Sequence, residues 1–252
     1  MIVCAIGAFP LQAGTVSYDL ASQWANNSNP NGTFSFKQGN TLLPYQSSFT
    51  ALGALALPGV TSGYAPGDVP GDFLPLIAKA TANGVSTNDY LTGDVVFHTV
   101  DGFNGNPAAG QLNIDWTAPT SGTITISGDI WYAQSSVTRS NDFSLELVRG
   151  GVVIETIETG TISPTSSLGS GRNNQDPLSS GGSLSVDSGD VIELVAQRSA
   201  GQSAGSADGL NLTITETTTT TSAPEPSAFA LGVLAIGGVL MTRRVASKTR
   251  DR

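Results

Sequence analysis

Two aromatic residues followed by a short polar segment form the most suggestive group of side chains in this sequence. Trp131 and Tyr132 come first, and Arg139, Asn141 and Asp142 follow. Flat aromatic rings can stack on sugar rings, and nearby polar groups can hydrogen-bond the sugar hydroxyls, so these five residues are candidate glycan contacts. Strand alternation would place only one of the two rings outside, and a sandwich core normally buries a tryptophan. Core packing is therefore the favoured interpretation, and a sugar platform is the alternative.

No combination of residues typical of catalysis stands out. His98 is the only histidine, it lies in the segment VVFHTV, and no Gly-x-Ser-x-Gly elbow accompanies the many serines, so we interpret it as structural. Glu146, Glu155 and Glu158 could serve a glycan hydrolase, but they fall in or near an expected outward-facing hairpin, where solvation explains them. We predict no catalytic residue and a protein that is not an enzyme, with a secreted glycan hydrolase as the least favoured alternative.

Calcium binding is the only metal chemistry that the composition leaves open. One histidine and one cysteine, Cys4, essentially exclude a zinc site, whereas calcium needs only oxygen ligands. The segments DGFNGN and DSGD could supply such ligands, although neither matches an EF-hand loop and Asx-Gly turns explain both without an ion. The candidate ligands are Asp101, Asn104 and Asn106 in the first segment, and Asp187 and Asp190 in the second. No other cofactor is predicted.

The main part of the chain is strongly acidic. The net charge is -9, but five of the eleven basic residues follow position 242. Residues 1–242 therefore contain six basic and nineteen acidic residues. Nucleic-acid binding requires clustered Lys and Arg, so no nucleic-acid partner is expected. An acidic surface suits solubility outside a cell.

Short alternating segments predict an all-β fold. In QLNIDWTAP, GTITISGDIWY and ADGLNLTITET, apolar residues alternate with polar ones, as a half-buried antiparallel sheet requires. Gly150 and Gly151 separate two further runs of this kind and predict a hairpin turn. Seven or eight such strands from residue 94 onward predict an antiparallel β-sandwich, most similar to a jelly roll, over residues 14–215.

The N-terminal third is less regular. A short aromatic strand is expected at Phe34 and Phe36, but the following segment contains too many prolines and glycines for a regular element. The one helix-like candidate, GDFLPLIAKATANG, is short and interrupted by Pro75. We expect this third to wrap the sandwich and to add one or two edge strands, without an independent core.

Both ends of the chain carry apolar segments. Residues 1–13 end in the small residue Ala13 and indicate a signal peptide, which lacks a basic start and is therefore predicted to be truncated. After a Thr-rich linker at 216–223, an apolar run of 16 residues, Ser227–Thr242, precedes a cluster of arginines. As a helix it would cover about 24 Å, close to the lower limit for a membrane anchor, with the basic residues at the cytoplasmic face. The anchor residues are Phe229, Leu231, Val233, Leu234, Ile236, Val239, Leu240, Arg243 and Arg244.

The order Pro-Glu-Pro, apolar helix and Arg-rich end, over residues 224–252, resembles the PEP-CTERM sorting signal of exported bacterial proteins. This resemblance implies an exosortase, an integral-membrane transpeptidase-like enzyme, as a partner that recognises Pro224, Glu225 and Pro226 and processes the anchor. The body resembles the ectodomains that often precede such tails, through YDLASQW, WTAPTSGTITISGDIW and SGDVIELV.

These resemblances imply a location and a role. The protein is expected to be exported, anchored in the membrane at least transiently by its C-terminal helix, and then held at the cell surface or in the extracellular matrix. We expect a non-catalytic structural or binding role in the exopolysaccharide layer, with extracellular polysaccharide as a candidate partner. The alternative is a carbohydrate-binding module with a defined glycan ligand.

Overall fold

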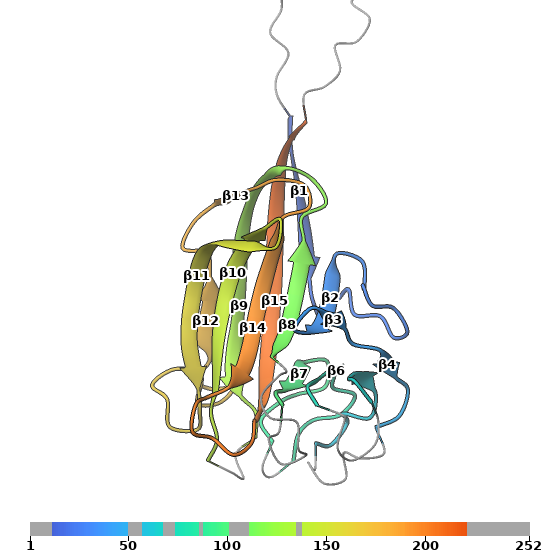
Figure 1. Ribbon diagram of the computed structural model, residues 1–252, viewed down its shortest axis with the longest axis vertical. Helices are drawn as coiled ribbons and strands as arrows, with labels where there is room; N and C mark the ends of the chain where they lie inside the picture. Colours follow the sequence, from blue (N-terminus) through green and yellow to red (C-terminus); the bar gives the residue numbers. More distant parts are fainter. Residues whose placement is uncertain are drawn as a thin grey trace, which may run out of the picture. The chain divides into compact units, whose positions relative to one another are not determined.

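The protein is described here from a computed structural model, which covers residues 12–49, 57–67, 74–85, 88–100, 111–134 and 138–220. The chain divides into two units, Thr15–Thr218 and a second unit made of Met1–Gly14 with Thr219–Arg252. The first unit contains almost all described residues and consists of two antiparallel sheets (Figure 1). The all-β prediction is therefore confirmed.

A six-stranded sheet has the strand order β11-β10-β14-β8-β2-β3. β10 and β14 alternate, since every second residue is buried from Asn141 to Leu147 in β10 and from Ile192 to Ala196 in β14. This period of two is the sequence pattern from which these strands were predicted. The strands are β2 (Phe34–Gln38), β3 (Thr41–Leu42), β8 (Leu112–Thr117), β10 (Asn141–Arg149), β11 (Val152–Ile162) and β14 (Val191–Arg198).

A nine-stranded sheet has the main order β12-β9-β15-β7-β6-β5-β4, with β1 added to β15 and β13 added to β9. The long strand β9 pairs with β15 over ten consecutive residue pairs, which makes these two strands the centre of the sheet. The strands are β1 (Gln12–Asp19), β4 (Tyr45–Gln46), β5 (Gly63–Tyr64), β6 (Leu76–Lys79), β7 (Val95–His98), β9 (Gly122–Tyr132), β12 (Asp176–Ser179), β13 (Leu184–Val186) and β15 (Ala207–Thr220).

The main apolar core lies between the two sheets. It combines inward residues of the six-stranded sheet, such as Trp116 and Leu145, with inward residues of the nine-stranded sheet, such as Ile130 and Leu210. Burial of these side chains is the dominant favourable term for a fold without disulfides. The predicted β-sandwich is thus present.

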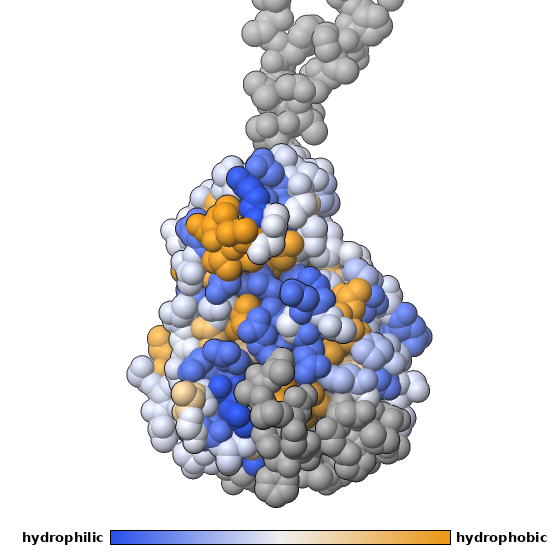
Figure 2. Space-filling view, viewed as in Figure 1, coloured by the Kyte–Doolittle hydropathy of each residue, from blue (hydrophilic) through white to orange (hydrophobic). Residues whose placement is uncertain are grey.

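The hairpin predicted at Gly150 and Gly151 joins β10 to β11. Both glycines have positive φ, 58° and 80°, a conformation that other residues adopt only with strain. β11 is the outermost strand of its sheet, and it begins with the exposed apolar residues Val152, Val153 and Ile154. Figure 2 shows apolar surface at this end of the sheet.

The N-terminal third contributes six of the described strands, β1 to β6, to the two sheets, which is more than the one or two edge strands expected. It also supplies most of a second apolar cluster, which the sequence analysis did not expect. This cluster packs Phe49, Val60, Leu76 and Tyr90 against Trp131. The helix-like candidate at 71–84 was wrong, because residues 76–79 form β6 and pair with β7. Its apolar residues are buried on both sides of the strand, so their spacing resembled a helix.

Several predictions concern residues outside the described ranges. They include most of the signal peptide, the first calcium segment with Asp101, Asn104 and Asn106, and the sorting and anchor segment 224–252. β15 continues to Thr220, so the first five residues of the segment expected as a linker belong to a strand. Within the described ranges, no helix has the length and apolar character that a membrane span requires.

Candidate functional site

The two aromatic residues predicted as glycan contacts are both buried. Trp131 is 0% exposed and Tyr132 is 1% exposed, so neither presents a ring face to solvent. Tyr132 faces the core between the sheets, whereas Trp131 faces the second cluster, which covers the other side of β9. The expectation that one ring would lie outside was wrong, because the N-terminal third covers that face. Core packing, the favoured interpretation, describes both residues.

The Trp131 ring fills a site shaped by its neighbours. Its Nε1 donates to the Asp89 carbonyl oxygen at 2.7 Å, and the Arg172 guanidinium lies 5.3 Å from the ring centroid. Gly209 is its cross-strand partner on β15, and a Cβ at Gly209 would lie 2.2 Å from the indole carbons. The ring therefore depends on this glycine for its space.

The three polar residues of the predicted group do not converge on one exposed surface. Asn141 is fully buried and donates through Nδ2 to Asp208 and to the Ser206 carbonyl oxygen, while Thr99 donates to its Oδ1 at 2.7 Å. Arg139 donates to the Gly205 carbonyl oxygen at 2.9 Å. Asp142 accepts hydrogen bonds from Thr161 and Ser199, both at 2.7 Å. These contacts connect the sheets and loops.

Asp208 is the most deeply buried carboxyl group of this network. Burial raises its pKa well above the usual range, against the hydrogen bonds from Asn141 and Ser206 that lower it. Burial also raises the pKa of the nearby Tyr132 hydroxyl to about 12, with the charge of Asp208 acting in the same direction. An isolated buried charge is costly, and the hydrogen bonds to Asp208 offset this cost. We therefore interpret the network as part of the packed interior.

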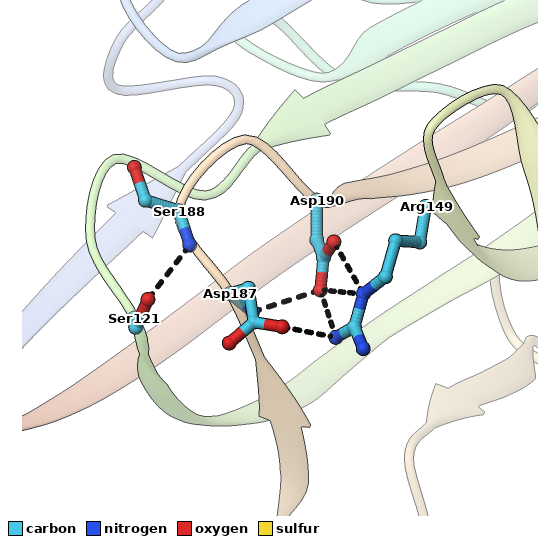
Figure 3. A network of polar contacts seen from close by, with 5 residues as sticks. All are labelled: Ser121, Arg149, Asp187, Ser188 and Asp190. Carbon is cyan, nitrogen blue, oxygen red and sulfur yellow. Dashed lines mark hydrogen bonds and ion pairs between the residues drawn. The ribbon is translucent and has the colours of Figure 1, made fainter.

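The predicted calcium ligands Asp187 and Asp190 are held by an arginine. Figure 3 shows Arg149 between them: its Nε donates to Asp190 Oδ1 at 2.9 Å, and its Nη2 lies 3.1 Å from Asp187 Oδ2. Asp190 Oδ2 also accepts from the Asp187 backbone N–H at 2.8 Å, and the Asp190 N–H donates to the Asp187 carbonyl oxygen at 2.9 Å, so these two residues close the turn between β13 and β14. The guanidinium occupies the position that a cation would need. Among the described residues, no group of three or more His, Cys, Asp or Glu is arranged to hold a metal ion.

His98 is buried at the end of β7, where its Nδ1 lies 2.7 Å from the Thr99 carbonyl oxygen.

The three carboxylates considered for hydrolysis have different surroundings in the fold. Glu155 is exposed, Glu158 accepts a hydrogen bond from the Ser179 backbone N–H, and Glu146 accepts one from Ser144 Oγ. His98, Glu146 and Glu158 therefore have local structural contacts, and Glu155 lies at the surface.

A row of carboxylates crosses the outer face of the six-stranded sheet. Glu146 on β10, Glu193 on β14 and Asp115 on β8 are direct cross-strand partners, and Lys37 on β2 forms an ion pair with Asp115. Burial raises the pKa of both Asp115 and Glu193, more than Lys37 and Asn113 lower them. Asn113 donates to Glu193 and Lys37 pairs with Asp115, so both carboxyl groups already have partners within the protein.

A hollow of about 290 Å³ lies beside the half-buried ring of Trp24. Around this ring are polar side chains from four separate segments, together with the small residues Ala80 and Gly93. An aromatic ring combined with a few placed polar groups is the usual composition of a small-molecule site. The polar lining residues are Asn26, Ser62, Lys79, Thr81 and Thr92.

The Trp24 ring is held firmly by its neighbours. β1 ends at Asp19, and the turn that follows is closed by the Ser22 N–H, which donates to Asp19 Oδ1 at 2.7 Å. The indole stacks on Phe36 with centroids 5.2 Å apart and meets Tyr64 edge-on at 5.4 Å. Its Nε1 donates to Asn26 Oδ1 at 3.1 Å. One face is thus packed, while the ring still borders the hollow.

The opposite rim is formed by the end of β6 and a tight turn. Lys79 is the last residue of β6, and Asp94 closes the turn by accepting a hydrogen bond from the Leu91 N–H at 2.8 Å. Gly93 has φ of 98° in this turn, and a Cβ there would meet nothing within 4 Å. Thr92 N and Oγ1 both donate to Asn83 Oδ1, which fixes the threonine at the rim.

Sequence reasoning missed the hollow because its residues are far apart in the chain. The only local signal was the segment YDLASQW, which was noted as a resemblance and not as a site. The acidic row left a stronger signal. Asn113 and Asp115 alternate with core residues in QLNIDWTAP, so they had to share one outer face, but the pairing with Glu193 could not be deduced.

No protein-family model and no curated protein matches the sequence. Several solved structures are distantly similar. A family 35 carbohydrate-binding module from Clostridium thermocellum is 14% identical, with 55% of this chain and 88% of that chain covered and a TM-score of 0.27. The CBM22-1 xylan-binding domain of Paenibacillus barcinonensis Xyn10C is 13% identical over 50% and 83%, with a TM-score of 0.27. Eiger TNF from S. frugiperda is 13% identical over 47% and 69%, with a TM-score of 0.24. Similarities of this size do not identify a function.

Proposed function

We propose that the β-sandwich is a non-catalytic glycan-binding unit whose ligand occupies the Trp24 hollow. The observation that carries this proposal is a half-buried tryptophan beside a hollow of about 290 Å³ whose lining is otherwise mostly polar and small. This volume is near the lower end of the range of about 300–1,000 Å³ for small-molecule sites, which suits one or two sugar units.

The chemistry of the lining suits a sugar. A pyranose ring has an apolar face that can pack against the indole, and hydroxyl groups that both donate and accept hydrogen bonds. Thr81 and Thr92 already donate their hydroxyl protons to Gly59 and Asn83, so their oxygens can accept from the ligand. Asn26 uses its Oδ1 for the Trp24 Nε1, which leaves its NH₂ group to donate.

A glycan array with the full chain tests this proposal. We expect saturable binding to at least one glycan class. Trp24→Phe should weaken this binding, since phenylalanine keeps the packing against Phe36 and offers a smaller ring. Thr156→Ala, on the exposed part of β11, is the control that should bind as the wild type does. Absence of binding to every glycan, or equal binding by Trp24→Phe, would refute the hollow as the site.

We also propose that the protein is exported and sorted by an exosortase through its PEP-CTERM tail, at least transiently anchored in the membrane and then placed at the cell surface or in the matrix. Support comes from the order of Pro224-Glu225-Pro226, the apolar run and the arginines. Expression in an exosortase-bearing bacterium should yield a surface form shortened at the C-terminus, detectable by mass spectrometry. Replacing the three tripeptide residues by alanine should abolish the shortening, and an unchanged product would reject this proposal.

A further inference from the structure

The charge of the hollow is opposite to that of the chain as a whole. Among the described lining residues Lys79 is the only charged one, although the chain carries a net charge of -9. In an acidic protein, a single cation in a polar hollow is a selective feature. It attracts an anionic group of a ligand that fits the hollow.

Lys79 keeps hydrogen-bonding capacity for a ligand. Its Nζ donates to the Ala21 carbonyl oxygen at 2.7 Å, and an ammonium group has three donors. Within the described part of the chain Lys79 forms no ion pair, in contrast to Lys37, Arg149 and Arg172, which each contact a carboxylate. The ammonium is therefore anchored on one side only.

One carboxylate lies in the neighbourhood and is already occupied. Burial raises the pKa of Asp19, but hydrogen bonds from Ser22 and Thr213 and the charge of Lys79 outweigh this and lower it. Asp19 accepts from the Ser22 N–H at 2.7 Å and from Thr213 Oγ1 at 3.0 Å. It thus closes the turn after β1 instead of pairing directly with the ammonium.

The other polar groups divide the hollow into two kinds of contact. The Asn26 NH₂ group and the ammonium of Lys79 can only donate, which suits a carboxylate. The oxygens of Thr81 and Thr92 have used their protons and suit sugar hydroxyls. Trp24 supplies the apolar wall between them.

We propose that the hollow selects an acidic sugar, with the carboxylate of a uronic acid against Lys79 and the sugar ring against Trp24. This inference rests on the proposed glycan-binding function and narrows its ligand class. A charge-assisted hydrogen bond is stronger than a neutral one, so the acid should bind about tenfold more tightly than a neutral analogue.

The test compares oligosaccharides of galacturonate, glucuronate and mannuronate with their methyl esters, which keep the sugar stereochemistry and lose the charge. Calorimetric titration of the full chain should show tighter binding of an acid than of its ester. Lys79→Met should remove this preference, and Lys79→Arg should retain it. Arg198→Met is the matched control, because Arg198 donates to the Ser203 carbonyl oxygen at the surface and is not among the lining residues of the hollow.

The outcomes separate the two proposals. An acid preference lost in Lys79→Met and kept in Lys79→Arg supports the inference, as does weaker acid binding at raised ionic strength. Equal binding of acid and ester, with Trp24→Phe still weakening both, overturns the acidic ligand and retains glycan binding. Acid preference that survives in Lys79→Met also overturns it. Absence of binding to acids, esters and the neutral array overturns both proposals.

Discussion

Replacing Glu193 by glutamine is expected to stabilise the protein above neutral pH. Glu193 lies between two other acids of the row on the six-stranded sheet, with Asp115 and Glu146 as its direct cross-strand partners. Like charges in this position repel each other. Lys37 forms an ion pair with Asp115 alone, so the row keeps an excess of negative charge when every carboxyl is ionised.

The size of the effect follows from the spacing. Side chains directly opposite each other are about 5 Å apart, and two unit charges at that distance repel by about 3 kcal/mol at an effective dielectric constant of about 20. Glu193 is only half buried, so solvent screening reduces this to about 1–1.5 kcal/mol. Glutamine keeps an oxygen for the Asn113 Nδ2, which donates to Glu193 at 2.7 Å.

The pH dependence gives the sign of the prediction. The folded state raises the pKa of Glu193 above its unfolded value of about 4.3. A raised pKa means that the folded protein favours the protonated carboxyl. The stability that this group contributes is therefore fully present below the unfolded pKa, and it is lost as pH rises through the folded pKa. Glu193→Gln does not titrate, so its advantage over the wild type should be small near pH 4 and should grow with pH.

Urea unfolding at several pH values between about 4 and 8.5 measures this advantage directly. At the highest pH the expected gain is about 1–1.5 kcal/mol, or a melting temperature roughly 2–6 °C higher for a chain of this size. Glu155→Gln, at an exposed position on β11, is the control and should show no such pH-dependent gain. A variant less stable than the wild type at pH 8.5, or a gain that does not change with pH, would refute the reasoning.

Two further predictions address the packing of Trp131 and the Arg149 network. Gly209→Ala should lower the unfolding free energy by about 2–3 kcal/mol, because its Cβ would lie 2.2 Å from the Trp131 ring, whereas Gly182→Ala, with open space around its Cβ, should have little effect in the same urea assay. Arg149→Met should destabilise the protein at neutral pH and much less in acid. The hydrogen bonds from Arg149 lower the pKa of Asp190, and stability from a lowered pKa is present above the unfolded value of about 3.9 and lost as pH falls through the folded one. Equal destabilisation at pH 7 and pH 2.5 would contradict this assignment.

The regular part of the sandwich could be predicted because apolar residues occupy every second position of its longer strands, with polar residues between them. Leu112, Ile114 and Trp116 all lie in the core, and the glycine pair at 150–151 forms the predicted turn. These are local patterns with a period of two, and a slip by one residue would expose every core side chain. The positions of β8, β10 and the β10–β11 hairpin therefore follow from the sequence alone.

The candidate site could not be predicted because it depends on what covers each sheet. Trp131 and Trp24 are chemically equivalent, and only the first lies in a clearly predicted strand. The structure buries Trp131 beneath irregular segments containing Phe49 and Tyr90, while Trp24, in a turn after β1, keeps its border on the hollow. Irregular segments have no periodic pattern from which their packing can be deduced.

The surroundings of Glu216, near the end of the β-sandwich, also could not be predicted from the local sequence. In the sequence it belongs to TETTTTT, a segment without large apolar residues, for which an extended solvated chain is the natural expectation. In the structure its carboxylate is buried in β15 and accepts hydrogen bonds from the Tyr18 hydroxyl at 3.0 Å and from Thr120 Oγ1 at 2.7 Å. Tyr18 is 198 residues away in the chain. Burial, followed by this hydrogen bond, raises the pKa of the Tyr18 hydroxyl to about 12, so it remains a donor to Glu216 across the physiological range. The polar end of β15 is thus held by partners that no local sequence pattern specifies. The hollow and the acidic row are also formed by residues distant in the sequence, so they could be identified only from the fold.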